Sequence, residues 1–93
     1  MNKKKKGSRN EHRSMDLLAA EGYRCTRAAG SLGAWDVIGI GLKDVVLCQV
    51  KSNEWPRRDE MQKLMSFKAP QNCHKIVHLW RDRQNEPEVM ELE

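Results

Sequence analysis

The chain has 93 residues, enough for one domain with a small hydrophobic core, so that a partner subunit would add to its stability. Its net charge of +4 and its pI near 9.2 favour a polyanionic partner such as nucleic acid. No apolar run is long enough to span a bilayer and no charged-then-apolar leader precedes the domain, which excludes a helical membrane protein and predicts a cytoplasmic location.

The N-terminal part predicts a basic arm followed by a helix. Four consecutive lysines at positions 3–6 suggest that residues 1–7 form a disordered basic arm, which either contacts phosphate or only adds solubility. Ser8 and Glu11 then have the spacing of a capping box, which predicts a helix over residues 9–21 that stops at Gly22.

Two roles remain open for Glu11. It lies four residues before Met15, on the apolar stripe that continues to Leu18, so its carboxylate faces the core side of the helix. Glu11 therefore either caps the start of the helix or is an acid directed at the sheet.

Three strands are predicted next. The first covers residues 23–28 and is followed by a loop with enough glycine for substrate backbone to approach closely. The other two are runs rich in β-branched residues on either side of residues 41–43, a pattern typical of a hairpin. Their acidic and amide side chains lie at the strand ends, where a metal site can be built.

The second strand of this hairpin has two different faces. Because side chains alternate along a strand, Val46, Cys48 and Val50 share one face, and Gln49 and Lys51 share the other. An unpaired amide or ammonium group is costly to bury, which suggests that Gln49 and Lys51 have a specific role.

The C-terminal half predicts a helix and two further strands. Pro56 suits the first turn of a helix that continues to about Lys68, with a buried stripe of Met61, Leu64 and Met65. Residues 75–80 and 88–92 are predicted strands. The predicted order is therefore α-β-β-β-α-β-β.

Zinc and disulfide chemistry are not indicated. The three cysteines are widely spaced with no C-x-x-C motif, so buried free thiols are expected. His74 and His78 are predicted to lie about 13 Å apart on a strand, which argues against a shared metal.

Taken together, the motifs resemble those of the PD-(D/E)xK nuclease superfamily, and within it the archaeal Holliday-junction resolvases and their small bacterial and phage relatives. The matching segments, within residues 7–80, are Arg9-Asn10-Glu11, Glu21-Gly22-Tyr23, Arg27-Ala28-Ala29-Gly30-Ser31, Asp36 and Gln49-Val50-Lys51. Two positions depart from the family pattern: Trp35 stands where proline is usual, and Gln49 where an acid is usual.

The resemblance implies an α/β fold with a restriction-endonuclease-like core, a mixed central sheet flanked by helices, in a single domain over residues 8–93. It implies a metal-dependent endonuclease, using Mg²⁺ or Mn²⁺, that hydrolyses phosphodiester bonds in branched DNA such as four-way junctions. A homodimer is expected, since a four-way junction has two strands to cut symmetrically. The phage relatives leave a phage-encoded origin open.

In such a site Asp36 would be the principal metal ligand, with Glu11 a second ligand, the Gln49 side-chain carbonyl a neutral third and the Val50 backbone carbonyl a further oxygen. Lys51 would orient or deprotonate the attacking water, or offset charge on the phosphate. The residues expected to contact DNA are Arg9, Arg13, Arg27, Ser31, Arg57 and Arg58.

Several alternatives remain open from the sequence. Arg57 and Arg58 lie in the first turn of the second helix, where the helix dipole does not favour cations, so they either contact DNA phosphate or are simply solvated. Ser31 either contacts a phosphate or is a plain turn residue. The whole chain could be a nuclease for flaps or linear duplex, or a DNA-binding module that lost its chemistry through Gln49.

Overall fold

The computed structural model describes residues 3–28 and 33–92, with the side chains described from Gly7 onward. Its elements in chain order are α1 (Lys3–Ala20), β1 (Arg24–Arg27), β2 (Val37–Ile40), β3 (Val45–Ser52), α2 (Arg58–Ser66), β4 (Cys73–Trp80) and β5 (Glu88–Leu92). Neither helix in this part of the chain is long and apolar enough to cross a membrane.

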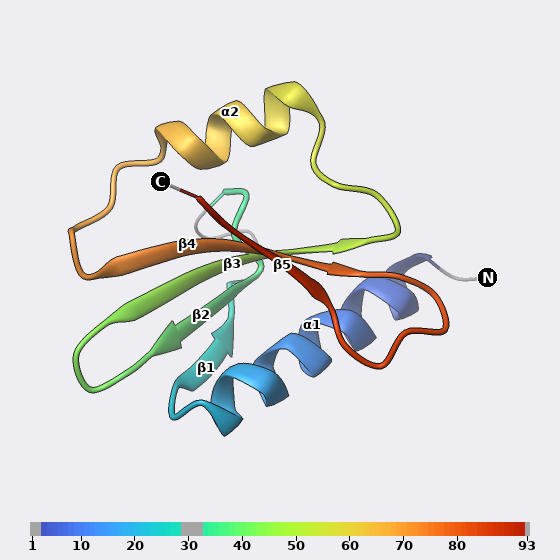
Figure 1. Ribbon diagram of the computed structural model, residues 1–93, viewed down its shortest axis with the longest axis horizontal. Coiled ribbons are helices and arrows are strands. Elements are labelled where there is room, and N and C mark those ends of the chain that lie inside the picture. Colours follow the sequence, from blue (N-terminus) through green and yellow to red (C-terminus); the bar gives the residue numbers. More distant parts are fainter. Residues whose placement is uncertain (1–2, 29–32, 93) are drawn as a thin grey trace.

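The strands form one mixed sheet in the order β1-β2-β3-β4-β5. Strands β3 and β4 are parallel, and the other neighbouring pairs are antiparallel. The chain crosses from β3 to β4 through α2, as a parallel pair requires. Helices α1 and α2 lie on opposite sides of the sheet (Figure 1). The predicted fold class and element order are confirmed.

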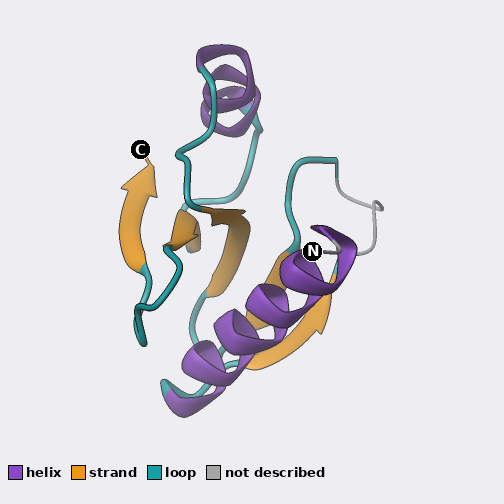
Figure 2. Cartoon of the chain, turned by 90° about the vertical axis from the view of Figure 1, so that its right-hand side faces the viewer, coloured by secondary structure: helices purple, strands orange, loops and turns teal. Residues whose placement is uncertain are grey.

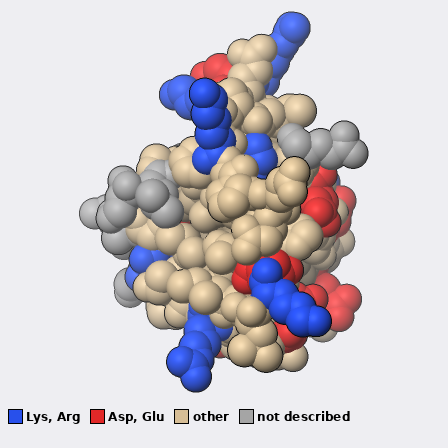
Figure 3. Space-filling view, turned by 90° about the vertical axis from the view of Figure 1, so that its left-hand side faces the viewer, with Lys and Arg blue, Asp and Glu red and all other residues tan. Residues whose placement is uncertain are grey.

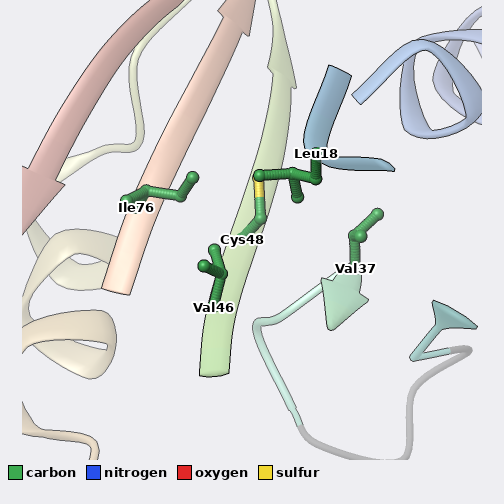
Figure 4. Close-up of a cluster of buried hydrophobic side chains, with 5 residues drawn as sticks. All are labelled: Leu18, Val37, Val46, Cys48 and Ile76. Atoms are coloured by element: carbon green, nitrogen blue, oxygen red, sulfur yellow. The ribbon is translucent and has the colours of Figure 1, made fainter. Parts of the chain in front are cut away.

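Alternation along β3 divides the core into two layers. On the α1 side, Val46 and Cys48 pack with Leu18, Val37 and Ile76 (Figure 4). On the α2 side, the buried side chains are Trp35, Leu47, Leu64 and Val77. The face predicted for each β3 side chain is therefore correct, and the central strand is covered on both sides.

The start of α1 differs from the prediction. The helix begins at Lys3, so residues 3–6 belong to it and do not form a separate arm, and Ser8 lies inside the helix rather than at its N-cap. Lysine is a good helix former, and propagation costs little once packing at Leu18 has fixed a helix. A capping-box pattern was thus a false signal for the helix start.

Helix α2 is shorter than predicted. It begins at Arg58, after the N-cap residue Arg57, whereas Pro56 lies outside it. Leu64 is fully buried as expected, but Met65 is 52% exposed. The predicted stripe was too wide, because Met65, the next-to-last residue of the helix, faces solvent beside the buried Leu64.

A buried polar network fixes α1 against β4. The Ser14 hydroxyl, fully buried, lies 2.9 Å from His78 Nδ1 and accepts a hydrogen bond of 2.8 Å from Trp80 Nε1. The Arg13 guanidinium stacks 4.0 Å above the Trp80 ring. These contacts set the position of α1 along the sheet, and hence that of Glu11 one turn earlier.

Candidate functional site

Asp36 is held at the point where β2 begins. Its backbone N–H donates to the Cys48 carbonyl and its own carbonyl accepts from the Ala28 N–H, both at 2.9 Å. Its side-chain Oδ2 accepts a hydrogen bond of 2.8 Å from the Val50 N–H. Three hydrogen bonds to backbone groups therefore fix Asp36 beside the C-terminal end of β3, at the end of the sheet that faces the viewer in Figure 2.

The environment of Asp36 favours a bound cation. Burial raises the pKa of its carboxyl above the ordinary value; the Val50 N–H opposes this shift, and the charges of Glu11, which raises the pKa, and of Lys51, which lowers it, also act on it. A half-buried carboxylate whose charged form is disfavoured gains from a cation that offsets the cost of desolvation.

Gln49 lies two residues before Lys51 on the α2 face of β3. It is 7% exposed, and its Nε2 donates to the Ala34 carbonyl at 3.3 Å. Its Oε1 is buried without a hydrogen-bond partner. An orphaned amide oxygen is costly, and it is also an oxygen donor that a hard cation accepts.

Lys51 forms an ion pair that the sequence did not indicate. Its Nζ lies 3.4 Å from Glu60 Oε2, and the two side chains are 27% and 36% exposed. Glu60 comes from the first turn of α2. Strand β3 and helix α2, which covers it, are therefore in contact at Lys51, the residue expected to act on the attacking water.

Glu11 is also paired. Its Oε1 accepts a hydrogen bond of 2.9 Å from Arg27 Nε and lies 2.8 Å from Arg27 Nη2 in an ion pair. Arg27 belongs to β1, so this ion pair joins the first helix to the edge strand. Glu11 thus comes from the α1 side, as the acid role requires, whereas Gln49 and Lys51 lie on the α2 face.

The neighbouring turn of α1 is tied to the end of β3. Asn10, which is 2% exposed, donates from Nδ2 to the Ser52 hydroxyl at 2.7 Å. Its Oδ1 accepts from Arg13 Nη1 at 3.3 Å. Neither Asn10 nor Ser52 was a predicted site residue. Asn10 could have been found from the sequence, because it is a polar residue at the helical spacing of the buried stripe.

The residues predicted to contact DNA have different surroundings. Arg9, Arg57 and Arg58 are exposed. Arg13 is engaged by Trp80 and donates to the Gln84 carbonyl at 3.0 Å, and Arg27 pairs with Glu11. Ser31 lies outside the described residues. At the opposite end of the sheet, the Lys and Arg side chains are scattered, and Asp and Glu side chains lie beside some of them (Figure 3).

Trp35 has a structural role. It is 1% exposed on the α2 face and makes an edge-to-face contact with Phe67, with ring centroids 5.7 Å apart. It therefore links the segment before Asp36 to the end of α2. An aromatic residue can replace proline before the acid because packing, instead of a fixed φ angle, holds the backbone here.

A metal site made only of protein groups is not preformed. Within residues 3–28 and 33–92, no three His, Cys, Asp or Glu side chains are arranged to hold a metal ion. The donor set nevertheless fits Mg²⁺, which binds through one or two carboxylates and completes its shell with waters and substrate oxygens. Asp36 and the orphaned Oε1 of Gln49 supply such donors.

The three cysteines, His74 and His78 have other surroundings than the residues of this candidate site. All three cysteines are free; Cys48 is buried, whereas Cys25 and Cys73 are only partly buried, and burial raises the pKa of each thiol. His74 contacts Asp44 and Glu91 near the other end of β4, and His78 contacts Ser14.

Comparison with known proteins identifies the fold. No family model matches the sequence, and no curated protein matches it. The structure is similar to that of Hjc from Archaeoglobus fulgidus, a Holliday junction resolvase from an archaeal hyperthermophile, with a TM-score of 0.73 and 20% sequence identity. The similarity covers 89% of this chain and 73% of that chain. The chain therefore shares the fold of this resolvase structure.

Proposed function

We propose that this protein is a metal-dependent endonuclease that hydrolyses phosphodiester bonds in branched DNA such as four-way junctions. The observation that carries the proposal is the Asp36 carboxylate, half-buried and fixed by the Val50 N–H at the end of β3. It occurs on a fold similar to that of a Holliday junction resolvase, with Lys51 one residue farther along the strand.

Four groups would hold Mg²⁺ or Mn²⁺: the carboxylate of Asp36, the amide Oε1 of Gln49, the backbone carbonyl of Val50 and, directly or through water, Glu11. When bound, the metal ion supplies charge stabilisation at the phosphoryl oxygens and activates a water molecule. Asp36 orients this assembly because its own position is fixed by three backbone contacts.

Side chains of the protein would carry out the other tasks of the reaction. Lys51 would orient the attacking water or accept its proton, and its charge would offset the charge that develops on the phosphate. Arg27 holds Glu11 through an ion pair and a hydrogen bond from its Nε, so Arg27 would serve the site by positioning an acid. The exposed residues Arg9, Arg57 and Arg58 would contact DNA phosphates, supported by the net charge of +4.

The test is cleavage of a labelled four-way junction beside flap and linear duplex substrates, with Mg²⁺ or Mn²⁺. Asp36→Asn should abolish cleavage and leave junction binding largely intact, because it removes a ligand charge without touching the basic surface. A wild-type cleavage rate in this variant would contradict the assignment of the site.

The same assay separates the alternatives. Preference for a flap or a linear duplex would assign a different target to the same chemistry. Tight junction binding with no cleavage at any metal concentration would make the protein a binding module, an outcome that the neutral Gln49 makes worth measuring.

A further inference from the structure

The ion pair between Lys51 and Glu60 lies between the central strand and α2. Oε2 of Glu60 lies 3.4 Å from Nζ of Lys51. The two side chains keep about a third or less of their surface in solvent. Because water screens such a pair only in part, the contact can restrict where the ammonium group lies.

Glu60 is itself held in place. Its other carboxylate oxygen, Oε1, accepts a hydrogen bond of 3.3 Å from the backbone N–H of Arg57, the N-cap residue of α2. One oxygen thus satisfies a free N–H group at the helix start, and the other faces Lys51. The carboxylate is positioned by the helix, since both of its oxygens have partners.

The neutral side chain at position 49 explains why such a partner matters. Residues 49 and 51 share the α2 face of β3, so a carboxylate at 49 would lie beside the ammonium of Lys51. This chain has Gln49 there, whose Nε2 is bonded to the Ala34 carbonyl. Lys51 therefore receives its counter-charge from α2, across the layer, instead of from its own strand.

We propose that Glu60 is a positioning residue of the active site, which holds Lys51 for the attacking water and supplies from α2 the carboxylate that position 49 lacks. The inference rests on the proposed nuclease function. It predicts that Glu60 affects the chemical step more than the binding of DNA, because its carboxylate contacts the Lys51 ammonium group and, at Arg57, only the backbone N–H.

The first experiment compares Glu60→Gln with Asp59→Asn. Both changes remove one negative charge from the first turn of α2, and glutamine keeps the acceptor for the Arg57 N–H. Only Glu60→Gln should lower kcat on the cleavable DNA, by about ten- to a hundredfold, with KM unchanged. A kcat within about fivefold of wild type, or an equal loss in Asp59→Asn, would overturn the proposal.

A second variant tests whether the carboxylate can be moved. Adding Gln49→Glu to Glu60→Gln returns a negative charge to the same face of β3, two residues from Lys51. At saturating Mn²⁺ the double variant should recover most of the kcat lost in Glu60→Gln, whereas Gln49→Glu added to the wild type or to Asp59→Asn should change kcat by much less than this recovery. If the double variant is as slow as Glu60→Gln, Glu60 does not act as the substitute for an acid at position 49.

A readout that needs no cleavage keeps the inference separate from the nuclease assignment. The ¹⁵Nζ and ammonium proton resonances of Lys51 should shift in Glu60→Gln and stay unchanged in Asp59→Asn, because the ion pair is lost in the first variant alone. If wild-type protein cuts none of the DNA substrates, the proposed function fails, and unchanged Lys51 resonances would overturn the ion pair independently.

Discussion

At the scale of single residues, Gln49 decides how strongly the proposed site can bind a metal ion. Its Oε1 is buried without a partner, and its Nε2 bonds to the Ala34 carbonyl. The amide oxygen can coordinate a hard cation but adds no negative charge. We therefore expect weak metal binding in the absence of DNA, with cleavage at millimolar Mg²⁺ or better support from Mn²⁺.

The variant Gln49→Glu tests this directly. The added charge should tighten Mn²⁺ binding measured by calorimetry and raise the cleavage rate at low Mg²⁺, because the metal ion would gain a further anionic ligand beside Asp36 and Glu11. Lower activity at every metal concentration would contradict a simple weakened-acid role. It would show that the amide N–H bond to Ala34, which a carboxylate cannot make, is what the site requires.

His78 makes stability depend on pH. Burial lowers its pKa to about 4, from an unfolded value near 6.5. Its contribution is thus complete above pH 6.5 and is lost as the pH falls toward 4, by up to about 3 kcal/mol. In urea unfolding between pH 7 and 4, His78→Gln should lose less stability than wild type.

His74 on the same strand is the control, because its shift has the opposite sign. The hydrogen bond that the His74 ring donates to the Glu91 carboxylate raises the pKa of His74, so its contribution is present at low pH and is lost as the pH rises. His74→Gln should therefore steepen the loss of stability on acidification slightly. Equal pH profiles for wild type and His78→Gln would refute the role of burial at His78.

At the scale of elements, α2 depends on a cation from the sheet. Lys75 Nζ of β4 donates to the carbonyls of Leu64, Met65 and Phe67, at 3.0, 2.8 and 3.1 Å. These carbonyls end the helix, where orphan acceptors and the dipole favour a positive charge. Since α2 carries Glu60, this contact also helps to set the position of the ion pair with Lys51.

The variant Lys75→Met keeps most of the aliphatic stem and removes the ammonium group. It should lower the free energy of unfolding by about 1–3 kcal/mol, because three helix carbonyls lose their charged donor. The matched control is Lys68→Met, at an exposed lysine just beyond the helix, which should change stability little. Equal losses in urea denaturation for the two variants would contradict the capping role.

At the scale of the whole molecule, the net charge and the exposed arginines concern DNA binding. If Lys and Arg neutralise phosphates, log K should fall linearly with log salt concentration, and Arg57→Ala or Arg58→Ala should each reduce the slope by about 1. Fluorescence anisotropy of a labelled junction at several salt concentrations measures this. A flat salt response would argue that DNA is not the partner.

A two-fold homodimer is the second expectation at this scale, since a symmetric junction presents two strands. The expected interface uses α2 or the last strands, where Met65 and Val89 are 52% and 59% exposed. Sedimentation should give a dimer at micromolar concentration and a monomer for Met65→Glu or Val89→Glu. Leu42→Glu, at a fully exposed turn residue, is the control. A wild-type monomer would count against a resolvase and favour the flap alternative.

The sequence by itself determined the local pattern. The order of elements, the hairpin after Asp36 and the two faces of β3 follow from periodicities of two and of 3.6 residues, which report burial directly. Gln49 and Lys51 could be assigned to one face for this reason. The start of α1 could not be predicted, because the helix propagates through the lysines before Ser8 in spite of the capping pattern there.

The tertiary structure decided the partners. The pairs Lys51–Glu60 and Glu11–Arg27 join residues of different elements, as does the contact between Arg13 and Trp80. Charged side chains have no periodic signal, and their partners depend on how helices and strands pack at long separation in the chain. Arg27, which was expected to contact DNA, therefore forms an ion pair with Glu11. The carboxylate beside Lys51 is that of Glu60, because packing brings α2 within reach of β3.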